Sequence, residues 1–213
     1  DQIINVIQPR GFDGPAEYIS EKQKKLLDLS TQNVERLNRL INEFLDSAKL
    51  ENSGFSMNRS LFNITDSVKT MMDSLSMIAG DKGIVLERAI PDKKIEIWGD
   101  PDKLNQVISN LVDNAIKYNR PSGRVQVFLE EADDTINISV KDTGMGIPKD
   151  DLDKIFNRFY RGYGNDTAGI PGTGLGLSIV KGIVNMHKGA ISVESEINSG
   201  SKFTVVLPKS LRK

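Results

Sequence analysis

The stretch PDKLNQVISNLVDNAIKYN, residues 101–119, reads as an amphipathic helix. The Asp-Pro pair at residues 100–101 is typical of a helix start, with aspartate as the cap and proline in the first turn. Apolar residues recur at helical spacing and predict one buried face, made of Leu104, Val107, Ile108, Leu111, Ala115 and Ile116. We therefore expect this helix to pack against the core of a folded domain.

A polar stripe runs beside that apolar face. Asn110 and Asn114 lie four residues apart, and Lys117 and Tyr118 follow on the same side. An amide oxygen is a hard, neutral ligand suited to Mg²⁺, lysine suits phosphate, and an aromatic ring can cover a base. The alternative is an ordinary solvated helix face, although two asparagines in a helix interior are unfavourable for helix formation.

The stretch DTGMGIP, residues 142–148, follows an expected strand, so Asp142 stands at a strand end. Gly144 and Gly146 permit close backbone approach or a positive φ. A lone carboxylate beside an apolar slot can accept a hydrogen bond from an exocyclic amine, which adenine has and guanine lacks at that position. A plain turn is the alternative for this motif alone.

A third stretch, GTGLGLSIVK at residues 172–181, has three alternating glycines before an apolar helix. It lacks the strand and spacing of a Rossmann fingerprint and the Gly-Lys-Ser/Thr of a P-loop. What remains is a flexible loop that leads into a helix N-terminus, where free amides can hold an anion.

The stretch IFNRFYRG, residues 155–162, combines aromatic anchors with Arg158 and Arg161 in an otherwise polar loop. The simplest interpretation is a short surface helix held down by its aromatic residues. The wider region, residues 143–173, is rich in Gly, Pro, Asn and Asp and predicts a long loop with one short helical piece around residues 150–160.

The composition excludes several classes of function. A net charge of −1 gives no electrostatic footprint for nucleic acid. Without cysteine, disulfides and thiol catalysis are excluded, and a single histidine excludes a multi-histidine metal site. There is no run of 18 apolar residues, so the sequence predicts no membrane contact within this chain.

The N-terminal quarter differs from the rest. Residues 19–50 show a 3,4 spacing typical of a helical bundle or dimer seam, made of Leu27, Ser30, Val34, Leu37, Ile41, Phe44 and Ala48. The alternative is one long helix packed on its own domain. Residues 1–9 read as the end of a preceding helix, and Glu51-Asn52-Ser53-Gly54 reads as a hinge.

The remaining pattern mixes helices and strands and predicts an α+β fold, with one sheet and one helical layer. Helices are expected at residues 65–79, 101–119 and 174–187. Short strands are expected at residues 60–64, 84–86, 95–98, 125–129, 136–140, 191–193 and 203–207.

Taken together and in this order, the four stretches resemble the N, G1, F and G2 boxes of the sensor histidine kinases. The ATP-binding fold of that family is shared with DNA gyrase, MutL and a heat-shock chaperone family. The segment LINEFLDSAKLENSG resembles the second helix of the kinase dimerisation hairpin. The resemblance thus implies a partial helical hairpin at residues 1–54, then a two-layer, Bergerat-type ATP-binding domain at residues 55–213.

The resemblance also implies roles for individual residues. Asn114 would hold Mg²⁺ against the triphosphate with Asn110 beside it, Asp142 would read the adenine amine, and residues 148–173 would form a lid over ATP. Arg158 and Arg161 would stabilise the transferring phosphoryl group or dock the hairpin. Further nucleotide contacts would come from Lys117, Tyr118, Gly144, Gly146, Ile147, Gly172, Thr173, Gly174, Leu175, Gly176, Leu177 and Thr204.

The implied activity is transfer of the ATP γ-phosphoryl group to a histidine, for relay to an aspartate of a response regulator. The family's acceptor motif, H-E-x-x-x-P, is absent from this sequence, and we interpret His187 as structural. We expect the chain to be a piece of a longer protein with the acceptor upstream, so that it does not autophosphorylate alone. Evolutionary loss of the acceptor is the alternative.

The implied partners are a second copy, which would pair through the hairpin, and a response regulator. The implied location is the cytoplasm, with membrane anchoring of a longer protein left open. Two other functions also remain open at this point. One is an ATPase or serine kinase of the same superfamily, and the other is a pseudokinase scaffold.

Overall fold

The computed structural model describes residues 20–51, 56–162, 170 and 172–210. The expected helix end at residues 1–9, most of the expected hinge and the middle of the expected lid lie outside the described residues. The chain divides into two compact units, residues 1–41 and 42–213. The boundary falls inside the first helix, so the last turns of that helix belong to the second unit.

Nearly all the expected elements are present, with ends that differ by a few residues. The helices are α1 (Glu21–Glu51), α2 (Ile64–Asp81), α3 (Pro101–Lys117) and α4 (Gly176–Met186). The strands are β1 (Ser60–Asn63), β2 (Val85–Ala89), β3 (Glu96–Gly99), β4 (Arg124–Glu131), β5 (Thr135–Asp142), β6 (Ala190–Glu196) and β7 (Gly200–Pro208).

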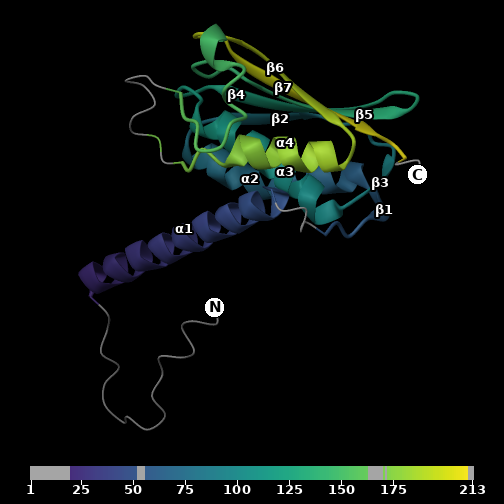
Figure 1. Cartoon of the computed structure of the whole chain (residues 1–213). Coiled ribbons are helices and arrows are strands. Elements are labelled where there is room, and N and C mark those ends of the chain that lie inside the picture. The colour runs from purple at the N-terminus through teal and green to yellow at the C-terminus, as the bar shows by residue number, and fades with distance from the viewer. Residues whose placement is uncertain (1–19, 52–55, 163–169, 171, 211–213) are drawn as a thin grey trace. The chain divides into compact units, whose positions relative to one another are not determined.

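The second unit is a sheet covered on one face by helices. Five strands lie in the order β2-β4-β5-β7-β6, with β2 parallel to β4 and the other pairs antiparallel. Strands β1 and β3 form a separate antiparallel pair. Helices α2, α3 and α4 lie together on one side of the large sheet (Figure 1). The expected two-layer α+β architecture is therefore confirmed.

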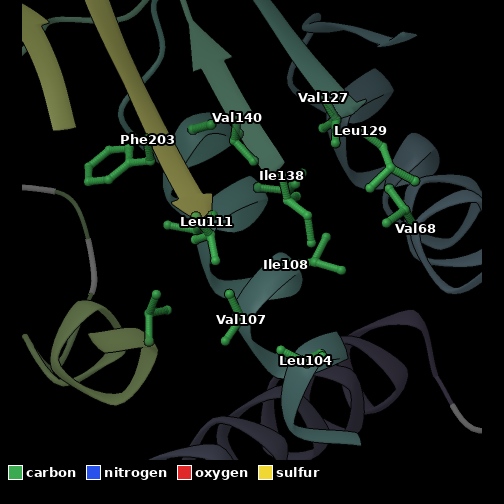
Figure 2. Packing of buried hydrophobic residues seen from close by; sticks show 14 of the residues in the cluster. Val68, Leu104, Val107, Ile108, Leu111, Val127, Leu129, Ile138, Val140 and Phe203 are labelled. Atoms are coloured by element: carbon green, nitrogen blue, oxygen red, sulfur yellow. The ribbon is translucent and has the colours of Figure 1, made fainter. Parts of the chain in front are cut away.

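The core lies between α3 and the sheet (Figure 2). All six apolar residues of the expected α3 face are at most 5% exposed. They pack in one cluster with residues of β4, β5 and β7, among them Val127, Leu129, Ile138, Val140 and Phe203. Burial of this face fixes the rotation of α3, so the neighbouring asparagine stripe is held at the edge of the core.

Helix α1 keeps much of its apolar seam exposed. Side chains at Leu27, Val34, Leu37 and Ile41 are about half exposed. Exposed apolar residues that repeat along one helix are expected to need a partner surface. Among the described residues, none of the helices is both long enough and apolar enough to cross a membrane.

One expected element is wrong. In place of a helical piece at residues 150–160, the structure has a 3-10 helix of three residues, Lys149–Asp151, followed by turns. Phe159 has a φ of 60°, which a right-handed helix does not admit. Its amide instead donates to the carbonyl of Gly174, and this hydrogen bond joins the loop to the residues just before α4.

Candidate functional site

A cavity of about 250 Å³ opens in the second unit, beside the C-terminal half of α3. The loop after β5, the segment before α4 and the start of β7 supply its other walls. Seven expected site residues line it: Asn114, Tyr118, Asp142, Gly146, Ile147, Arg161 and Leu177. All four stretches contribute to this set, and GTGLGLSIVK does so through Leu177 alone.

Asp142 ends β5 and lines this cavity, and it is only 7% exposed. Its Oδ1 accepts hydrogen bonds from the amides of Gly144 (2.7 Å) and Ser201 (3.2 Å). Burial raises the pKa of this carboxyl above its ordinary value, while the two backbone hydrogen bonds act in the opposite direction. Because both amides meet Oδ1, Oδ2 is the oxygen left to accept from a ligand.

Gly144 and Gly146 allow the close backbone approach that the sequence predicted, and the backbone they approach is that of Tyr118 and Glu196. A side chain at Gly144 would overlap the carbonyl oxygen of Tyr118, and one at Gly146, whose φ is 72°, would overlap that of Glu196. The amide of Met145 also donates to the Tyr118 carbonyl, at 3.1 Å. These glycines thus bring the loop onto the ends of α3 and β6, and that contact shapes the cavity wall.

The polar stripe of α3 divides between two places. Asn114 and Tyr118 face the cavity, whereas Asn110 is absent from its lining. The Oδ1 atom of Asn110 instead lies 3.2 Å from the position that a Cβ on Gly176 would occupy. Lys117 pairs with Asp113 at 2.5 Å and is not among the cavity residues. The asparagines therefore span the distance from the cavity to the start of α4.

The N-terminus of α4 is open toward Asn110. Leu175 occupies the cap position, and its side chain makes no capping hydrogen bond. The amide of Leu175 donates to Thr173 Oγ1 at 3.1 Å, and Thr173 Oγ1 donates to Glu43 Oε2 at 2.6 Å. The first amides of α4 thus remain available for an anion beside the asparagine stripe.

Tyr118 connects the cavity to this helix start. Its hydroxyl lies 3.9 Å from the position of a Cβ on Gly172, at the described end of the expected lid. Gly172 and Gly176 therefore both lie close to side chains of the polar stripe, and their contact with nucleotide stays a prediction.

The two arginines of the loop lie at different hollows. Arg161 lines the main cavity and donates to the carbonyl of Ile170 at 2.6 Å. Arg158 lines a second, more open hollow together with Lys181 and Asn185 of α4. Only Arg161 is thus placed to meet a ligand in the main cavity.

Thr204 lies away from the cavity. Its hydroxyl forms a hydrogen bond with that of Ser139 at 3.1 Å, on the strand face opposite Phe203. The β7 residues that line the cavity are Ser201 and Phe203, which sequence reasoning missed. The alternation of Phe203, Val205 and Leu207 was the available signal, because alternate residues of a strand share a face.

Gly174 allows a direct test of this local geometry. Its φ is 75°, and a Cβ there would lie 2.7 Å from the carbonyl carbon of Phe159. Gly174→Ala is expected to lower the free energy of unfolding by about 1–2 kcal/mol, measured by chemical denaturation. Gly80→Ala is the matched control, because a Cβ at Gly80 meets nothing within 4 Å. Equal stability of the two variants would contradict the assigned strain.

Comparison with known proteins agrees with this geometry. A family model described as histidine kinase-, DNA gyrase B-, and HSP90-like ATPase matches residues 99–211. Sensor protein SrrB of Staphylococcus aureus (strain NCTC 8325 / PS 47) is 35% identical over 187 residues, covering 87% of this chain and 32% of the relative. The chain therefore spans about a third of the length of that relative.

Two solved structures extend the likeness. Full-length ShkA in complex with AMPPNP is 26% identical, with a TM-score of 0.75 over 89% of this chain and 39% of ShkA. Histidine kinase ThkA in complex with response regulator protein TrrA is 23% identical, with a TM-score of 0.68 over 98% of this chain and 56% of that one. The chain belongs to the histidine kinase-, DNA gyrase B- and HSP90-like ATPase family, and its ATP-binding domain is of the sensor histidine kinase kind.

Proposed function

We propose that this chain is the catalytic ATP-binding part of a sensor histidine protein kinase. It transfers the γ-phosphoryl group of ATP to a ring nitrogen of a histidine. The observation that carries the proposal is one cavity lined by a buried carboxylate, Asp142, and by Asn114, next to the open N-terminus of α4. Such a site can read an adenine at one end and hold phosphates at the other.

Each wall of the cavity has a distinct role in this proposal. The free oxygen of Asp142 accepts a hydrogen bond from the adenine amine, directly or through water. Tyr118, Ile147 and Leu177 supply apolar surface against the base. The amides at the start of α4 and the Gly172–Gly176 loop hold the phosphates, and Arg161 neutralises charge on the transferred group. Lys117 and Thr204 keep their sequence-based assignment only if nucleotide binding rearranges their present contacts.

The residues present suit Mg²⁺ shared with phosphate. Among the described residues, no group of three or more histidine or acidic side chains could hold a metal by themselves. A single amide oxygen at Asn114 fits Mg²⁺, because this ion keeps waters and takes much of its coordination from substrate phosphates. Mg²⁺ would supply charge neutralisation at the phosphates, Asn114 would hold it, and Asn110 would be the neighbouring amide on the same helix stripe.

The acceptor histidine must come from outside these 213 residues. The only histidine of the chain, His187, is 2% exposed, and both of its ring nitrogens make hydrogen bonds. In the transfer, the acceptor nitrogen forms a bond to the γ-phosphorus, the bond to the β,γ-bridging oxygen breaks, and ADP and the imidazole proton leave. The chain contributes positioning and charge neutralisation, not the nucleophile.

A plain ATPase is the second candidate within the family, and one observation disfavours it. The ATPases of the superfamily that the sequence suggested as alternatives activate water with a carboxylate one turn before the metal-binding asparagine. That position is Asn110, an amide that cannot take a proton. The nearby carboxylate of Asp113 is paired with Lys117. A scaffold without nucleotide binding is disfavoured because the cavity and all four boxes are present.

The proposed partners are a second copy of this chain and a response regulator. The exposed apolar seam of α1 is suited to a homodimer in which two hairpins bury these residues. Histidine kinase ThkA forms a complex with response regulator protein TrrA, which supports a response regulator as a partner here, and we propose that this partner receives the phosphoryl group. We place the domain in the cytoplasm, where ATP and such a partner are found.

The test uses ATP labelled at the γ-phosphate and a separate hairpin that carries an acceptor histidine. The chain alone is expected to gain no acid-labile phosphate, whereas the added hairpin becomes labelled in the presence of Mg²⁺. A hairpin with the acceptor changed from histidine to glutamine is the control. Label on this chain alone, or steady ATP hydrolysis with no labelled hairpin, would contradict the proposal.

A further inference from the structure

His187 lies just past the end of α4 and makes two hydrogen bonds to separate parts of the second unit. Its Nε2 lies 3.0 Å from the amide nitrogen of Asp100, and its Nδ1 lies 2.8 Å from the carbonyl oxygen of Ile183. A backbone amide can only donate, so Nε2 must accept. The ring is therefore neutral, with its proton on Nδ1 and donated to Ile183.

Asp100 extends this contact to two further segments. Its Oδ1 accepts from the amide of Lys103 at 3.1 Å and so caps α3, and its Oδ2 accepts from the amide of Asn58 at 2.8 Å. Arg59 donates to the carbonyl of Met186, in the last turn of α4, at 3.2 Å. We call His187, Asp100, Asn58 and Arg59 the His187 latch. It joins the start of α3, the end of α4 and the residues that lead into β1.

The ring is fitted closely against the backbone at Gly99. A Cβ at Gly99 would lie 3.0 Å from Cδ2 and 3.1 Å from Nε2 of His187. Few side-chain atoms approach a backbone position so closely, and a larger residue at 99 would push the ring away from the Asp100 amide. The glycine thus lets the imidazole approach close enough to accept.

The latch lies at the opposite end of α3 and α4 from the proposed phosphate site. Asp100 and Asn110 are ten residues apart, or about 15 Å of helix, and Gly176 and His187 are eleven apart, or about 16 Å. The pairs Asp100–His187 and Asn110–Gly176 are both in contact, so the two helices run antiparallel with matched lengths. Fixing one end of this helix pair therefore sets how the asparagine stripe faces the start of α4.

We propose that neutral His187 is a positioning residue for the nucleotide site, and that protonation of its ring opens the latch and weakens Mg²⁺-ATP binding. The inference rests on the proposed nucleotide-binding function. It assigns to His187 a task beyond filling the core: it holds α3 and α4 in the alignment that the phosphate site needs.

Protonation would disturb the latch because of the groups around the ring. A proton on Nε2 would face the Asp100 amide, so two donors would meet and the hydrogen bond would be lost. The charged groups that act on the ring are the Asp100 carboxylate, which attracts the cation, and the Arg59 guanidinium, which repels it. Because Asp100 already caps α3 and holds Asn58, a turn of its carboxylate toward the ring would release those contacts.

The protonation behaviour of the ring agrees with this arrangement. Burial lowers the pKa of His187 below its ordinary value, more than the Ile183 carbonyl and Asp100 raise it. Between the lowered pKa of His187 in the folded chain and its ordinary pKa in the unfolded chain, the ring is protonated in the unfolded chain and neutral in the folded chain. The contribution of the latch is therefore complete above about pH 6.5 and is lost as the pH falls toward the lowered folded value.

The experiment compares the whole chain with two variants. His187→Gln offers an amide oxygen that can accept from Asp100 and does not titrate, whereas His187→Leu leaves the buried amide without an acceptor. At about pH 7.5, the leucine variant is expected to bind Mg²⁺-ATP about tenfold more weakly, with the glutamine variant close to wild type. From about pH 8 to about pH 5, wild type should lose affinity relative to the glutamine variant.

The outcomes separate the latch from the nucleotide site itself. Because Asp142 and the phosphates also titrate, the quantity compared is the difference between wild type and His187→Gln at each pH. No ATP binding by wild type at any pH would overturn the proposed function. Binding by all three proteins, with superimposable pH curves and equal affinities, would overturn the latch alone.

A measurement without nucleotide covers the case in which His187→Leu fails to fold. Nitrogen-15 NMR of the imidazole should show the Nδ1-protonated tautomer at neutral pH, and exchange of the Asp100 amide should quicken when the ring is protonated. The inference would be overturned by finding the Nε2-protonated tautomer at neutral pH. It would also be overturned if the hydrogen-exchange rate of the Asp100 amide did not change when the ring is protonated.

Discussion

Replacing Asn114 with alanine is expected to weaken binding of Mg²⁺-ATP by roughly tenfold to hundredfold, which corresponds to about 1.5–3 kcal/mol. Asn114 lines the cavity, and its amide oxygen is the ligand that we assign to Mg²⁺. Alanine keeps the helix and removes only the carboxamide group. Phosphoryl transfer to an added hairpin is expected to fall at least as far, because the phosphates would no longer be held in place.

The effect should depend on the metal. Isothermal titration calorimetry with Mg²⁺ and with a chelator gives four affinities for wild type and Asn114→Ala, and the two proteins should differ only when Mg²⁺ is present. Asn105→Ala is a matched control on the same helix. Its Oδ1 is buried without a hydrogen-bond partner among the described residues, and it does not line the cavity. Unchanged affinity of Asn114→Ala in Mg²⁺ would contradict the assigned role.

The helices and hairpins of this fold could be predicted because their signals are local. The apolar spacing in α3 identified six residues that all proved buried, and strand alternation located β4 with β5 and β6 with β7. Each of these patterns lies within about 20 residues and follows directly from helix or strand geometry.

The pairings that complete the fold join distant residues and left no such signal. Strand β5 pairs with β7, bringing the Ser201 amide to Asp142 from 59 residues away. His187 meets Asp100 across 87 residues. A single sequence shows neither partner of such a contact as special. The interpretation of His187 as a structural residue was therefore correct in that the residue is buried. Its contact with Asp100, and the alignment role that we propose for it, could be found only from the three-dimensional structure.

The errors have physical reasons as well. The apolar residues at 155–160 suggested a helix, but they instead fix a loop whose Phe159 adopts a positive φ and bonds to Gly174. Tertiary contact decided the outcome there. Thr204 was assigned to the site by resemblance; Phe203, on the opposite strand face, lines the cavity instead, and a role for Thr204 stays a prediction.

Asp142→Asn is expected to weaken ATP binding by about a hundredfold or more while the protein stays folded. Asparagine has the shape of aspartate, and its one oxygen can still accept from the Gly144 and Ser201 amides. Its amide nitrogen then occupies the place of the free carboxylate oxygen. Two donors, this nitrogen and the adenine amine, would face each other in a buried site, and the favourable contact becomes an unfavourable one.

The same exchange should change which base is preferred. Guanine presents a carbonyl where adenine has its amine, and an asparagine amide can donate to that carbonyl. The affinity ratio of ATP to GTP, measured by competition with a fluorescent nucleotide, is therefore expected to fall. Asp134→Asn, an exposed aspartate in the turn before β5, is the control and should leave the ratio unchanged. An equal loss for both nucleotides would argue that Asp142 does not read the base.

Stability separates this effect from general damage to the fold. Because burial raises the pKa of Asp142 above 3.8, the folded chain binds more protons than the unfolded chain between 3.8 and the raised value. Wild-type stability therefore declines across that window as the pH rises, and the neutral asparagine has no such decline. Denaturation curves should show Asp142→Asn gaining stability relative to wild type from acid toward neutral pH. On this account, the Asp142 carboxylate destabilises the fold while the site is empty and stabilises bound ATP. If Asp142→Asn lost both ATP affinity and stability at neutral pH, this account of the carboxylate would be refuted.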